Sequence, residues 1–213
     1  MSGSPSPPDP SEPERVAAVV GELKLKHAVI TSVTRDDLSD GGANQFARVI
    51  EEIRKLLPSC TIEVLTPDFR GAPRAPGIVM QARPDVFNHN IETVPRLYEQ
   101  VRPGADYRRS LRLLKRASEE YGALTKSGLM VGLGETVDGV RAVIFDLVEN
   151  GVAVLTIGQY LSPSRQHLPV DRYVTPEEFD RMADGAREAG ISQVFAGPLV
   201  RSSYMAGDIF KRL

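Results

Sequence analysis

The chain has 213 residues, enough for one domain with a sizeable core, and its 41% apolar and 25% charged residues are typical of a globular protein. Its 26 basic and 28 acidic residues give a net charge of -2, which excludes a global attraction to nucleic acid or to an anionic membrane. No apolar run is long enough to span a bilayer, and the amino terminus lacks the basic and apolar regions of a secretory signal, so we expect a cytoplasmic protein.

The predicted elements alternate along the chain. Residues 1–10 are rich in proline and serine, so we expect a disordered tail there and a single domain over residues 11–213. The patterns predict helices over 11–23, 46–57, 78–82, 108–118, 137–150 and 175–186, and strands over 27–33, 61–69, 86–92, 124–131, 153–160 and 192–200. Ser11 with Glu14, and Thr175 with Glu178, have the spacing of capping boxes.

Strict alternation of apolar strands and amphipathic helices predicts an α/β fold with a parallel sheet, as a doubly wound sheet or a barrel. Polar residues follow the strands at several separate points, so no single crevice is favoured and a partial (β/α) barrel fits better. They are Arg35, Asp36, Asp37, Asp68, Arg70, Asn88, Asn90, Glu92, Glu135 and Gln159. The chain begins with a helix, so we expect a missing first strand and self-association through the exposed edge of strand 27–33.

Cysteine usage limits the chemistry. Cys60 is the one cysteine, which excludes an intramolecular disulfide and any metal or iron–sulfur site built from several thiolates of this chain. Cys60 lies at the end of a helical pattern, where a small half-buried residue is a better interpretation than a reactive thiol.

The stretch Leu124–Glu135 predicts a buried strand followed by a turn that contains two glycines. Gly132 and Gly134 are spaced to let backbone N–H groups approach a small polar ligand, and the helix that follows offers the positive end of its dipole. The alternative is a plain connection between strand and helix. The turn lacks the Lys-Ser/Thr pair of a P-loop and the third glycine of a dinucleotide fingerprint.

Other residues are open to two interpretations. A buried Lys126 forms a Schiff base with a carbonyl substrate or pairs with an acidic residue such as Glu92. His89 is a general acid or base, or an interior hydrogen-bonding residue. Asp36 and Asp37 hold a hydroxylated ligand, or cap a loop.

Two further groups stand out. Arg201, Ser202, Ser203 and Tyr204 form a dense hydrogen-bonding group after the last strand, or a tail pinned by Arg201. The basic face of the helix over 108–118 carries Arg108, Arg112, Lys115 and Arg116. This face is solvated, or docks an acidic partner.

Several sequence blocks in a fixed order carry a family resemblance. They are Val29–Leu38 with Gly41–Ala43, Asp85–Val94, Thr125–Glu135, Thr156–Leu161 and Gly197–Tyr204. Over almost its whole length the chain resembles lipoyl synthase, a family of radical-SAM enzymes.

The resemblance implies a partial (β/α) barrel with S-adenosylmethionine and two [4Fe-4S] clusters. In such an enzyme one cluster cleaves S-adenosylmethionine to a 5′-deoxyadenosyl radical. The radical removes hydrogens from carbons 6 and 8 of an octanoyl group on a lipoyl domain or on the glycine cleavage H protein. The second cluster supplies the sulfur.

The resemblance also assigns residues. The implied S-adenosylmethionine site consists of Asn88, Asn90, Glu92, Gly132, Gly134, Glu135, Gln159 and Tyr160. One serine of Ser202 and Ser203 is an implied ligand of the second cluster, and Arg201 holds that segment. Arg35, Asp36, Asp37 and Lys126 complete the set as substrate or loop residues.

The sequence departs from the family pattern at two points. Met205 stands where the family has histidine, and both cysteine triplets are absent. In the family a CxxxCxxC motif lies just before a segment like Gly3–Pro7, so we expect a lipoyl synthase truncated before its cluster cysteines and inactive by itself. The alternatives are a partner chain that supplies the cysteines, a non-catalytic remnant that binds S-adenosylmethionine or a lipoyl domain, and a Schiff-base aldolase using Lys126.

Overall fold

The computed structural model describes residues 5–211, with side chains to residue 208. Six strands fall in one sheet in chain order: β1 (His27–Thr31), β2 (Thr61–Leu65), β3 (Val86–Asn88), β4 (Thr125–Val131), β5 (Val154–Gln159) and β6 (Gln193–Gly197). β1 pairs with β2, β4 with β5, and β5 with β6, and each of these pairs is parallel. The predicted α/β class with a parallel sheet is confirmed.

By its internal contacts the chain divides into two compact units. The sequence predicts a single domain over residues 11–213. Among the described residues, the first unit comprises 5–87 and 206–211, and the second comprises Asn88–Met205. Each unit has its own buried core, and each is described by itself below.

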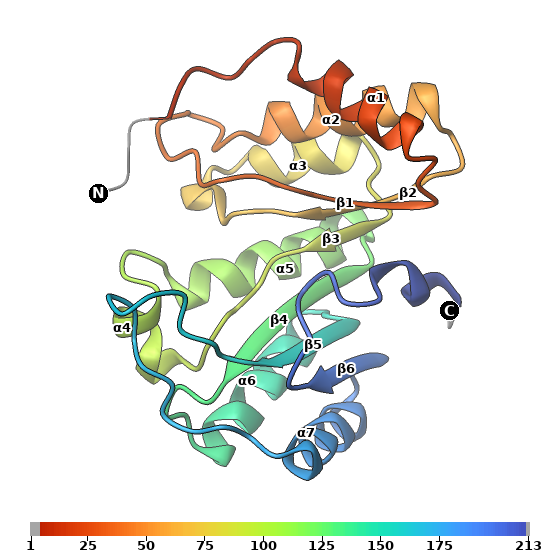
Figure 1. Ribbon diagram of the computed structural model, residues 1–213. Helices are drawn as coiled ribbons and strands as arrows, with labels where there is room; N and C mark the ends of the chain where they lie inside the picture. The colour runs from red at the N-terminus through yellow and green to blue at the C-terminus, as the bar shows by residue number, and fades with distance from the viewer. Residues whose placement is uncertain (1–4, 212–213) are drawn as a thin grey trace. The chain divides into compact units, whose positions relative to one another are not determined.

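In the first unit, helices α1 (Glu12–Glu22), α2 (Ala43–Leu56) and α3 (Ala75–Gln81) lie on one face of β1 and β2 (Figure 1). The amphipathic helix α2 buries Ile50 and Ile53, and β2 buries Ile62 and Val64. Short 3-10 turns occur at η1 (Phe69–Gly71) and η3 (Ala206–Lys211). Burial of these branched side chains is the main stabilising contribution to the unit.

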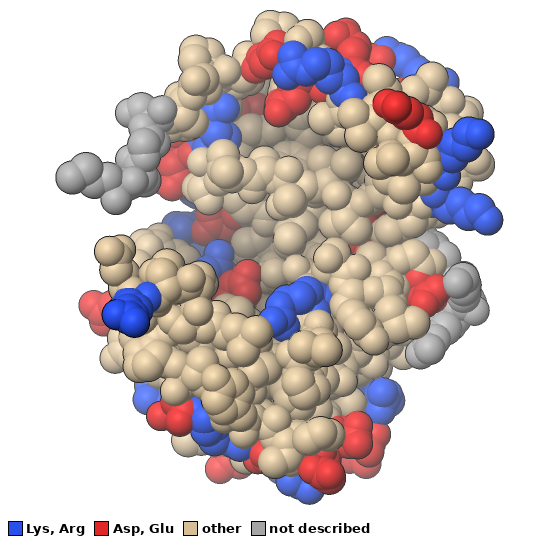
Figure 2. All heavy atoms as spheres, in the orientation of Figure 1, with Lys and Arg blue, Asp and Glu red and all other residues tan. Residues whose placement is uncertain are grey.

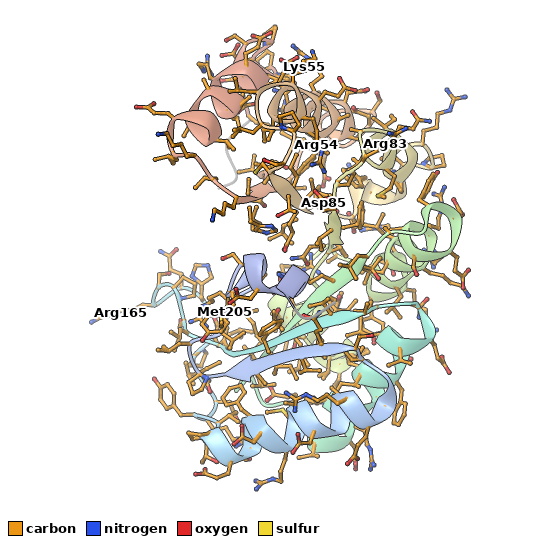
Figure 3. The ribbon with its side chains drawn as sticks, turned by 90° about the vertical axis from the view of Figure 1, so that its right-hand side faces the viewer. Arg54, Lys55, Arg83, Asp85, Arg165 and Met205 are labelled. Atoms are coloured by element: carbon orange, nitrogen blue, oxygen red, sulfur yellow. The ribbon has the colours of Figure 1, made fainter. Side chains whose placement is uncertain are left out.

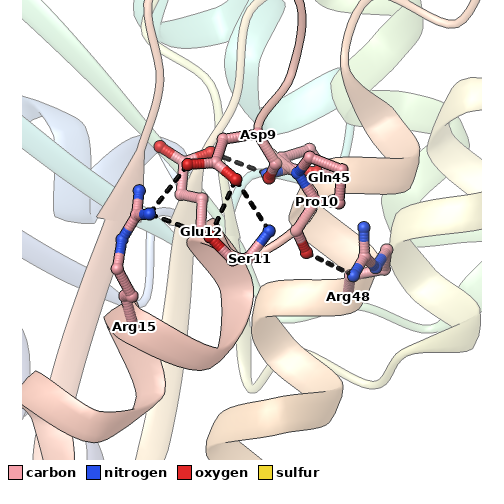
Figure 4. A network of polar contacts seen from close by, with 7 residues as sticks. All are labelled: Asp9, Pro10, Ser11, Glu12, Arg15, Gln45 and Arg48. Carbon is pink, nitrogen blue, oxygen red and sulfur yellow. Dashed lines mark hydrogen bonds and ion pairs between the residues drawn. The ribbon is translucent and has the colours of Figure 1, made fainter.

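The capping box predicted at Ser11 and Glu14 does not form. Ser11 has helical backbone angles (φ -92°, ψ -6°), whereas a capping residue needs an extended backbone to aim its oxygen at the helix. The Asp9 carboxylate accepts hydrogen bonds from the backbone N–H and the hydroxyl of Ser11, each at 2.8 Å, and from Arg15 at 2.7 Å (Figure 4). Arg48 of α2 donates to the Pro10 carbonyl at 2.7 Å. The last two residues of the predicted tail are thus held against α1 and α2.

Arg54 of α2 ties together three parts of the first unit (Figure 3). Its guanidinium donates to the carbonyls of Cys60 at 2.7 Å and Arg83 at 3.1 Å, and forms an ion pair with Asp85. The Asp85 carboxylate also accepts from the Ile62 backbone N–H at 2.7 Å. This cluster fixes the segment that leads into β3 against β2.

In the second unit, helices α5 (Tyr107–Tyr121), α6 (Val137–Glu149) and α7 (Pro176–Ala189) accompany β4, β5 and β6 (Figure 1). The core contains Leu114, Leu147, Leu155, Ile157 and Phe179, all less than 2% exposed. At the start of α7 the capping box of Thr175 and Glu178 is present, as predicted. The short elements η2 (Pro95–Leu97) and α4 (Tyr98–Val101) are absent from the sequence prediction.

Some strands are shorter than predicted, and β3 is the most affected. It ends at Asn88, whereas the sequence predicts a strand to Glu92. Glu92 has a left-handed backbone (φ 67°), which interrupts the ladder and leaves only an isolated bridge to Leu129. β2 ends at Leu65, just before Thr66 and Pro67, because proline has no N–H to continue the pairing.

Acidic and basic side chains are interspersed on the visible face of the molecule (Figure 2). Within residues 5–211, no helix combines the length and the apolar character that crossing a membrane would require.

Candidate functional site

The second unit contains a cavity of about 150 Å³ between the carboxyl-terminal half of β4, the same half of β5 and two loop segments. One segment follows β3, and the other follows β6. The lining residues are Asn90, Glu92, Gly128, Leu129, Met130, Thr156, Gly158, Gln159, Leu161, Val200, Arg201 and Ser202. The predicted site residues that the structure brings together here are Asn90, Glu92, Gln159, Arg201 and Ser202.

Two strand glycines leave room for the loop segments. A Cβ atom on Gly128 of β4 would stand 2.7 Å from the side-chain oxygen of Asn90 and 3.0 Å from the Thr156 hydroxyl. A Cβ atom on Gly158 of β5 would collide with the carbonyl oxygen of Val200. A glycine inside a strand commonly marks such a close approach, so both positions are needed to form the cavity wall.

The segment Asn90–Glu92 is fixed by hydrogen bonds to β4. The Glu92 N–H donates to the Gly128 carbonyl at 2.9 Å, and the Met130 N–H donates to the Glu92 carbonyl at 2.8 Å. These two bonds over-determine the left-handed backbone of Glu92, a conformation that an ordinary residue adopts only when its surroundings enforce it. The segment therefore presents its side chains in a fixed arrangement.

Asn90 and Glu92 give the cavity its polar character. The side-chain oxygen of Asn90 is buried and has no hydrogen-bond partner. Glu92 keeps a small accessible area, but dense protein around it makes desolvation the largest influence and raises the pKa of its carboxyl. Arg102 and the Asn90 amide act in the opposite direction. The cavity thus offers acceptors to a ligand that carries hydrogen-bond donors.

The turn after β4 satisfies its own backbone. The Glu135 carboxylate accepts from the Gly132 N–H at 2.7 Å and from the Leu133 N–H at 2.9 Å. Both glycines of the turn have left-handed backbones, with φ 94° at Gly132 and 95° at Gly134. The turn does not line the cavity directly, but a Cβ on Gly132 would collide with Gln159, which does.

Gln159 connects the cavity to a later loop. Its amide donates to the Arg172 carbonyl at 3.1 Å, and its side-chain oxygen accepts from the Val174 N–H at 2.9 Å. Tyr160 is 8% exposed and donates its hydroxyl to the Leu168 carbonyl at 2.9 Å. Both residues hold the loop between β5 and α7, and Gln159 alone of the two lines the cavity.

Three other candidates are buried outside the lining. Asn88 and Lys126 are fully buried, at 0% exposure. His89 is 1% exposed, and its Nε2 lies 2.8 Å from the Ser110 hydroxyl, which agrees with the interior hydrogen-bonding interpretation. A role for Asn88 or Lys126 toward a ligand stays a prediction.

The segment after β6 crosses the end of β5. Arg201 donates to its neighbouring carbonyl at Val200 at 2.6 Å, and the Tyr204 N–H donates to the Arg201 carbonyl at 2.8 Å. Ser202 is partly buried and lines the cavity, whereas Ser203 is exposed. The arginine thus stabilises a tight turn that brings Ser202 to the cavity.

Arg35, Asp36 and Asp37 belong to the first unit. Arg35 forms a bidentate ion pair with Asp37, with N–O distances of 2.8 and 2.7 Å, and this pairing lowers the pKa of the Asp37 carboxyl. Asp36 lies 3.9 Å from Arg70. These residues form a local cluster in the loop after β1, and their role toward a substrate stays a prediction.

Sequence reasoning missed several lining residues. Gly128, Thr156, Gly158 and Val200 do not carry catalytic chemistry, so a search for reactive side chains passes over them. An isolated glycine within an apolar strand is the signal that could have identified Gly128 and Gly158.

Comparison with protein families places the whole first part of the chain in one superfamily. The sequence profile of the Radical SAM superfamily matches residues 2–147. Lipoyl synthase from Methylococcus capsulatus is 58% identical over 206 residues, which are 96% of this chain and 64% of that protein. Lipoyl synthase from Pelodictyon phaeoclathratiforme is 54% identical over 211 residues, which are 99% of this chain and 72% of that protein.

The lipoyl synthase from Actinobacillus pleuropneumoniae serotype 5b is 56% identical over 206 residues, which are 96% of this chain and 62% of that protein. The chain thus spans between 62% and 72% of the length of these three relatives.

Solved structures share the fold at low sequence identity. The maturase HydG of the [FeFe]-hydrogenase matches with a TM-score of 0.66 at 16% identity, over 91% of this chain and 51% of that one. Streptococcus suis SuiB bound to S-adenosylmethionine matches with a TM-score of 0.66 at 12% identity, over 92% of this chain and 45% of that one.

Proposed function

We propose that this chain, which belongs to the lipoyl synthase family of the radical SAM superfamily, forms the S-adenosylmethionine-binding core of an enzyme. The proposed enzyme inserts sulfur at carbons 6 and 8 of a protein-bound octanoyl group. The observation that carries the proposal is the identity of 54–58% along 96–99% of this chain. The cavity beside β4 and β5 gives structural support to the proposal.

The residues of the cavity fit S-adenosylmethionine. The unpartnered oxygen of Asn90 and the Glu92 carboxylate are acceptors, and the ligand carries an ammonium group and hydroxyl groups that donate. Gly128 and Gly158 let the segments that carry Asn90 and Val200 approach the strands closely enough to form the cavity wall. When bound, S-adenosylmethionine supplies the group that abstracts hydrogen from the octanoyl chain.

The protein's own residues bind the ligand, orient it and keep water away from it. Asn90 and Glu92 hold the ligand's donors, and their fixed segment keeps those contacts in place. Gln159 anchors the loop beside them, and the turn at Val200–Ser202 covers the end of β5. Gly132, Gly134 and Glu135 support this wall through Gln159 rather than by direct contact.

The residues of this chain do not fit an iron–sulfur cluster. It has one cysteine, Cys60, which is 1% exposed, and burial raises the pKa of its thiol. Across the described residues, no three His, Cys, Asp or Glu side chains gather in a way that could hold a metal ion. We therefore propose that the isolated chain is inactive, and that the cysteines for both clusters come from outside these 213 residues. One serine of Ser202 and Ser203 remains the proposed oxygen ligand of the auxiliary cluster.

The proposed partners are octanoylated lipoyl domains and the glycine cleavage H protein. On the basic face of α5, Lys115 lies 3.7 Å from Glu119 and Arg116 lies 2.9 Å from Glu120, so these two charges are largely neutralised. Arg108 and Arg112 remain as the part of this face available to an acidic carrier. A cytoplasmic location belongs to the same proposal, supported by a single cysteine that excludes an internal disulfide.

A chimera tests the proposal. The part of the Methylococcus capsulatus lipoyl synthase that lies outside the match to this chain is joined to it, and the chimera is reconstituted anaerobically with iron and sulfide and assayed with an octanoylated carrier. We expect lipoylated carrier from the chimera, and from the chain alone neither product nor stoichiometric iron. A chimera that holds both clusters but forms no lipoyl group contradicts the proposal.

A variant of the same chimera tests the site. Glu92→Gln is expected to retain the clusters and to lose most of the product, because the acceptor for the ligand is weakened. Asp138→Asn, an exposed acid in the first turn of α6, is the matched control and is expected to leave activity unchanged.

Self-association through β1 is also part of the proposal. Among the described strands, β1 stands at one end of the sheet order and pairs only with β2, so its other edge has no strand partner. Sedimentation velocity over a concentration series is expected to show a dimer or larger species, and a monomer at all concentrations would exclude it.

A further inference from the structure

Arg102 does not line the cavity, but it contacts the segment that does. It follows α4 directly, and its backbone N–H donates to the Tyr98 carbonyl at 2.8 Å, which closes that short helix. Its side chain reaches the segment after β3, where its Nη1 donates to the carbonyl oxygen of Asn90 at 3.2 Å. One arginine thus links a short helix to the base of the candidate site.

The ring of Tyr98 keeps this arginine in place. The guanidinium carbon lies 5.8 Å from the centre of the Tyr98 ring, within the range of a cation–π interaction. The Tyr98 hydroxyl donates to the next carbonyl of the segment, at Ile91, at 2.6 Å. Two side chains from the same short helical region therefore hold two successive carbonyls. The Arg102 side chain is positively charged, and the Tyr98 side chain is neutral.

The charge matters because of Glu92, two residues further along. Glu92 is the one acidic residue among those that line the cavity, and burial disfavours its charged form. No ion pair to Glu92 is present in the described part of the chain, and the charge of Arg102 is the main influence that lowers the pKa of its carboxyl against the effect of burial. The titratable or charged groups around it are Arg102 and Tyr98 from the short helical region, and Arg201 from the opposite cavity wall.

We propose that Arg102 is a positioning residue for ligand binding: it fixes the Asn90–Glu92 segment through the Asn90 carbonyl and places a positive charge behind the Glu92 carboxylate that meets the ligand. This inference rests on the proposed function, because the ligand is taken to be S-adenosylmethionine. Arg102 acts through Glu92 and does not touch the ligand.

The first experiment needs no ligand. The chain is labelled with ¹³C at the glutamate carboxyl carbons and titrated by NMR, and the Glu92 signal is identified by its loss in Glu92→Gln. Arg102→Met is expected to raise the pKa of Glu92 by about 1 unit or more, because an opposite charge favours the charged form. Arg102→Lys is expected to raise it by less.

Tyr98→Phe is the matched control for the titration. It removes the hydrogen bond to the Ile91 carbonyl but leaves the charge of Arg102 in place. We expect no upward shift of the Glu92 pKa in this variant. An equal upward shift in Tyr98→Phe and Arg102→Met would mean that general loosening of the segment, rather than charge, is responsible, and would overturn the proposal.

The second experiment is a double-mutant cycle read by calorimetry with S-adenosylmethionine. Arg102→Met is expected to weaken binding about tenfold at pH 7, and by more as the pH is lowered, because protonation of Glu92 removes the charged acceptor. In the Glu92→Gln background the same substitution is expected to change the affinity less than about twofold, because the carboxylate through which Arg102 acts is no longer there. An equal loss in both backgrounds overturns the proposal.

The two experiments separate this inference from the function it rests on. If the wild-type chain does not bind S-adenosylmethionine but Arg102→Met raises the Glu92 pKa, the ligand assignment fails and the charge role of Arg102 stands. If binding occurs and the pKa of Glu92 does not depend on Arg102, the inference fails and the ligand assignment stands. If Arg102→Met does not fold, Arg102→Lys decides, since a Glu92 pKa equal to that of the wild type would overturn the inference alone.

Discussion

The side-chain oxygen of Asn90 lies 2.7 Å from the position that a Cβ atom on Gly128 would occupy. Any side chain at this point of β4 would push Asn90 out of the cavity wall or shift the strand. The oxygen is buried and unpartnered, so the structure maintains an acceptor at a cost in stability. This relationship links the sequence of a strand interior to the binding properties of the cavity.

Gly128→Ala is predicted to weaken S-adenosylmethionine binding at least about tenfold and to destabilise the chain by about 1–3 kcal/mol, as overpacking does. Calorimetry and urea unfolding measure the two effects. Gly185→Ala is the control, because a Cβ on this exposed helical residue would meet nothing within 4 Å. It is expected to stabilise α7 by about 0.5–1 kcal/mol and to leave binding unchanged. Binding that survives Gly128→Ala would contradict the role given to Asn90.

Arg54→Ala is predicted to destabilise the first unit by about 2 kcal/mol, because it leaves the Asp85 carboxylate and two carbonyls without their cationic donor. Its sequence neighbour Lys55 supplies the control. Lys55 lies 2.7 Å from Glu52 in an exposed pair, and Lys55→Ala is expected to change the unfolding free energy by less than about 0.5 kcal/mol. Figure 3 shows both side chains. Equal changes in the unfolding free energy for the two substitutions would contradict this stabilising role of Arg54.

The acid stability of the chain is predicted to depend on Glu178. A side-chain hydrogen bond from Arg172, helped by the Thr175 N–H, holds the pKa of Glu178 at about 2 against an ordinary value of 4.5. The unfolded chain therefore takes up a proton at this residue below about pH 4.5 while the folded chain does not. The stabilising contribution is present above that pH and is lost as the pH falls toward 2.

Glu178→Gln is expected to flatten the fall of stability between pH 4.5 and 2, measured as the urea midpoint at each pH. Glu188→Gln, an exposed acid on the same helix with no ion pair in the described structure, is the control and should leave the curve parallel to that of the wild type. High salt is expected to reduce the difference, since the Arg172 pair is exposed. Parallel curves for both variants would argue against a depressed Glu178 pKa.

Thr175→Ala is predicted to destabilise the second unit by about 1 kcal/mol, because it removes the side-chain oxygen that accepts from the Glu178 N–H at the start of α7. Thr175→Ser keeps the oxygen and is expected to lose much less. Urea unfolding at pH 7 distinguishes the two. An identical loss in both variants would point to the missing methyl group instead of the cap.

Much of the fold could be predicted because its signals are local. The apolar strand at Thr125–Val131 and the amphipathic helix at Val137–Glu149 are apparent from periodicity, and the Thr175 box from spacing. Ser11 has the same spacing, but its box does not form, because Ser11 has helical backbone angles and donates its N–H and its hydroxyl to Asp9. The competition between two short polar side chains is decided by backbone angles that spacing does not encode.

The site was predictable only in part. Asn90, Glu92 and Gln159 were found as polar residues near strand ends, whereas the left-handed backbone of Glu92 and the contact of Gly158 with Val200 depend on pairing between distant segments. Arg102 escaped notice because it acts from behind the cavity wall. Its contact with the Asn90 carbonyl requires the fold of a short helix that periodicity does not reveal.

The carboxylate of Glu135 occupies the place in the Gly132–Leu133 turn that a phosphate takes in nucleotide-binding loops. An anionic guest would have to expel this built-in anion and accept its repulsion. The turn is therefore already filled by a carboxylate of the chain itself, and a ligand without phosphate leaves that arrangement unchanged.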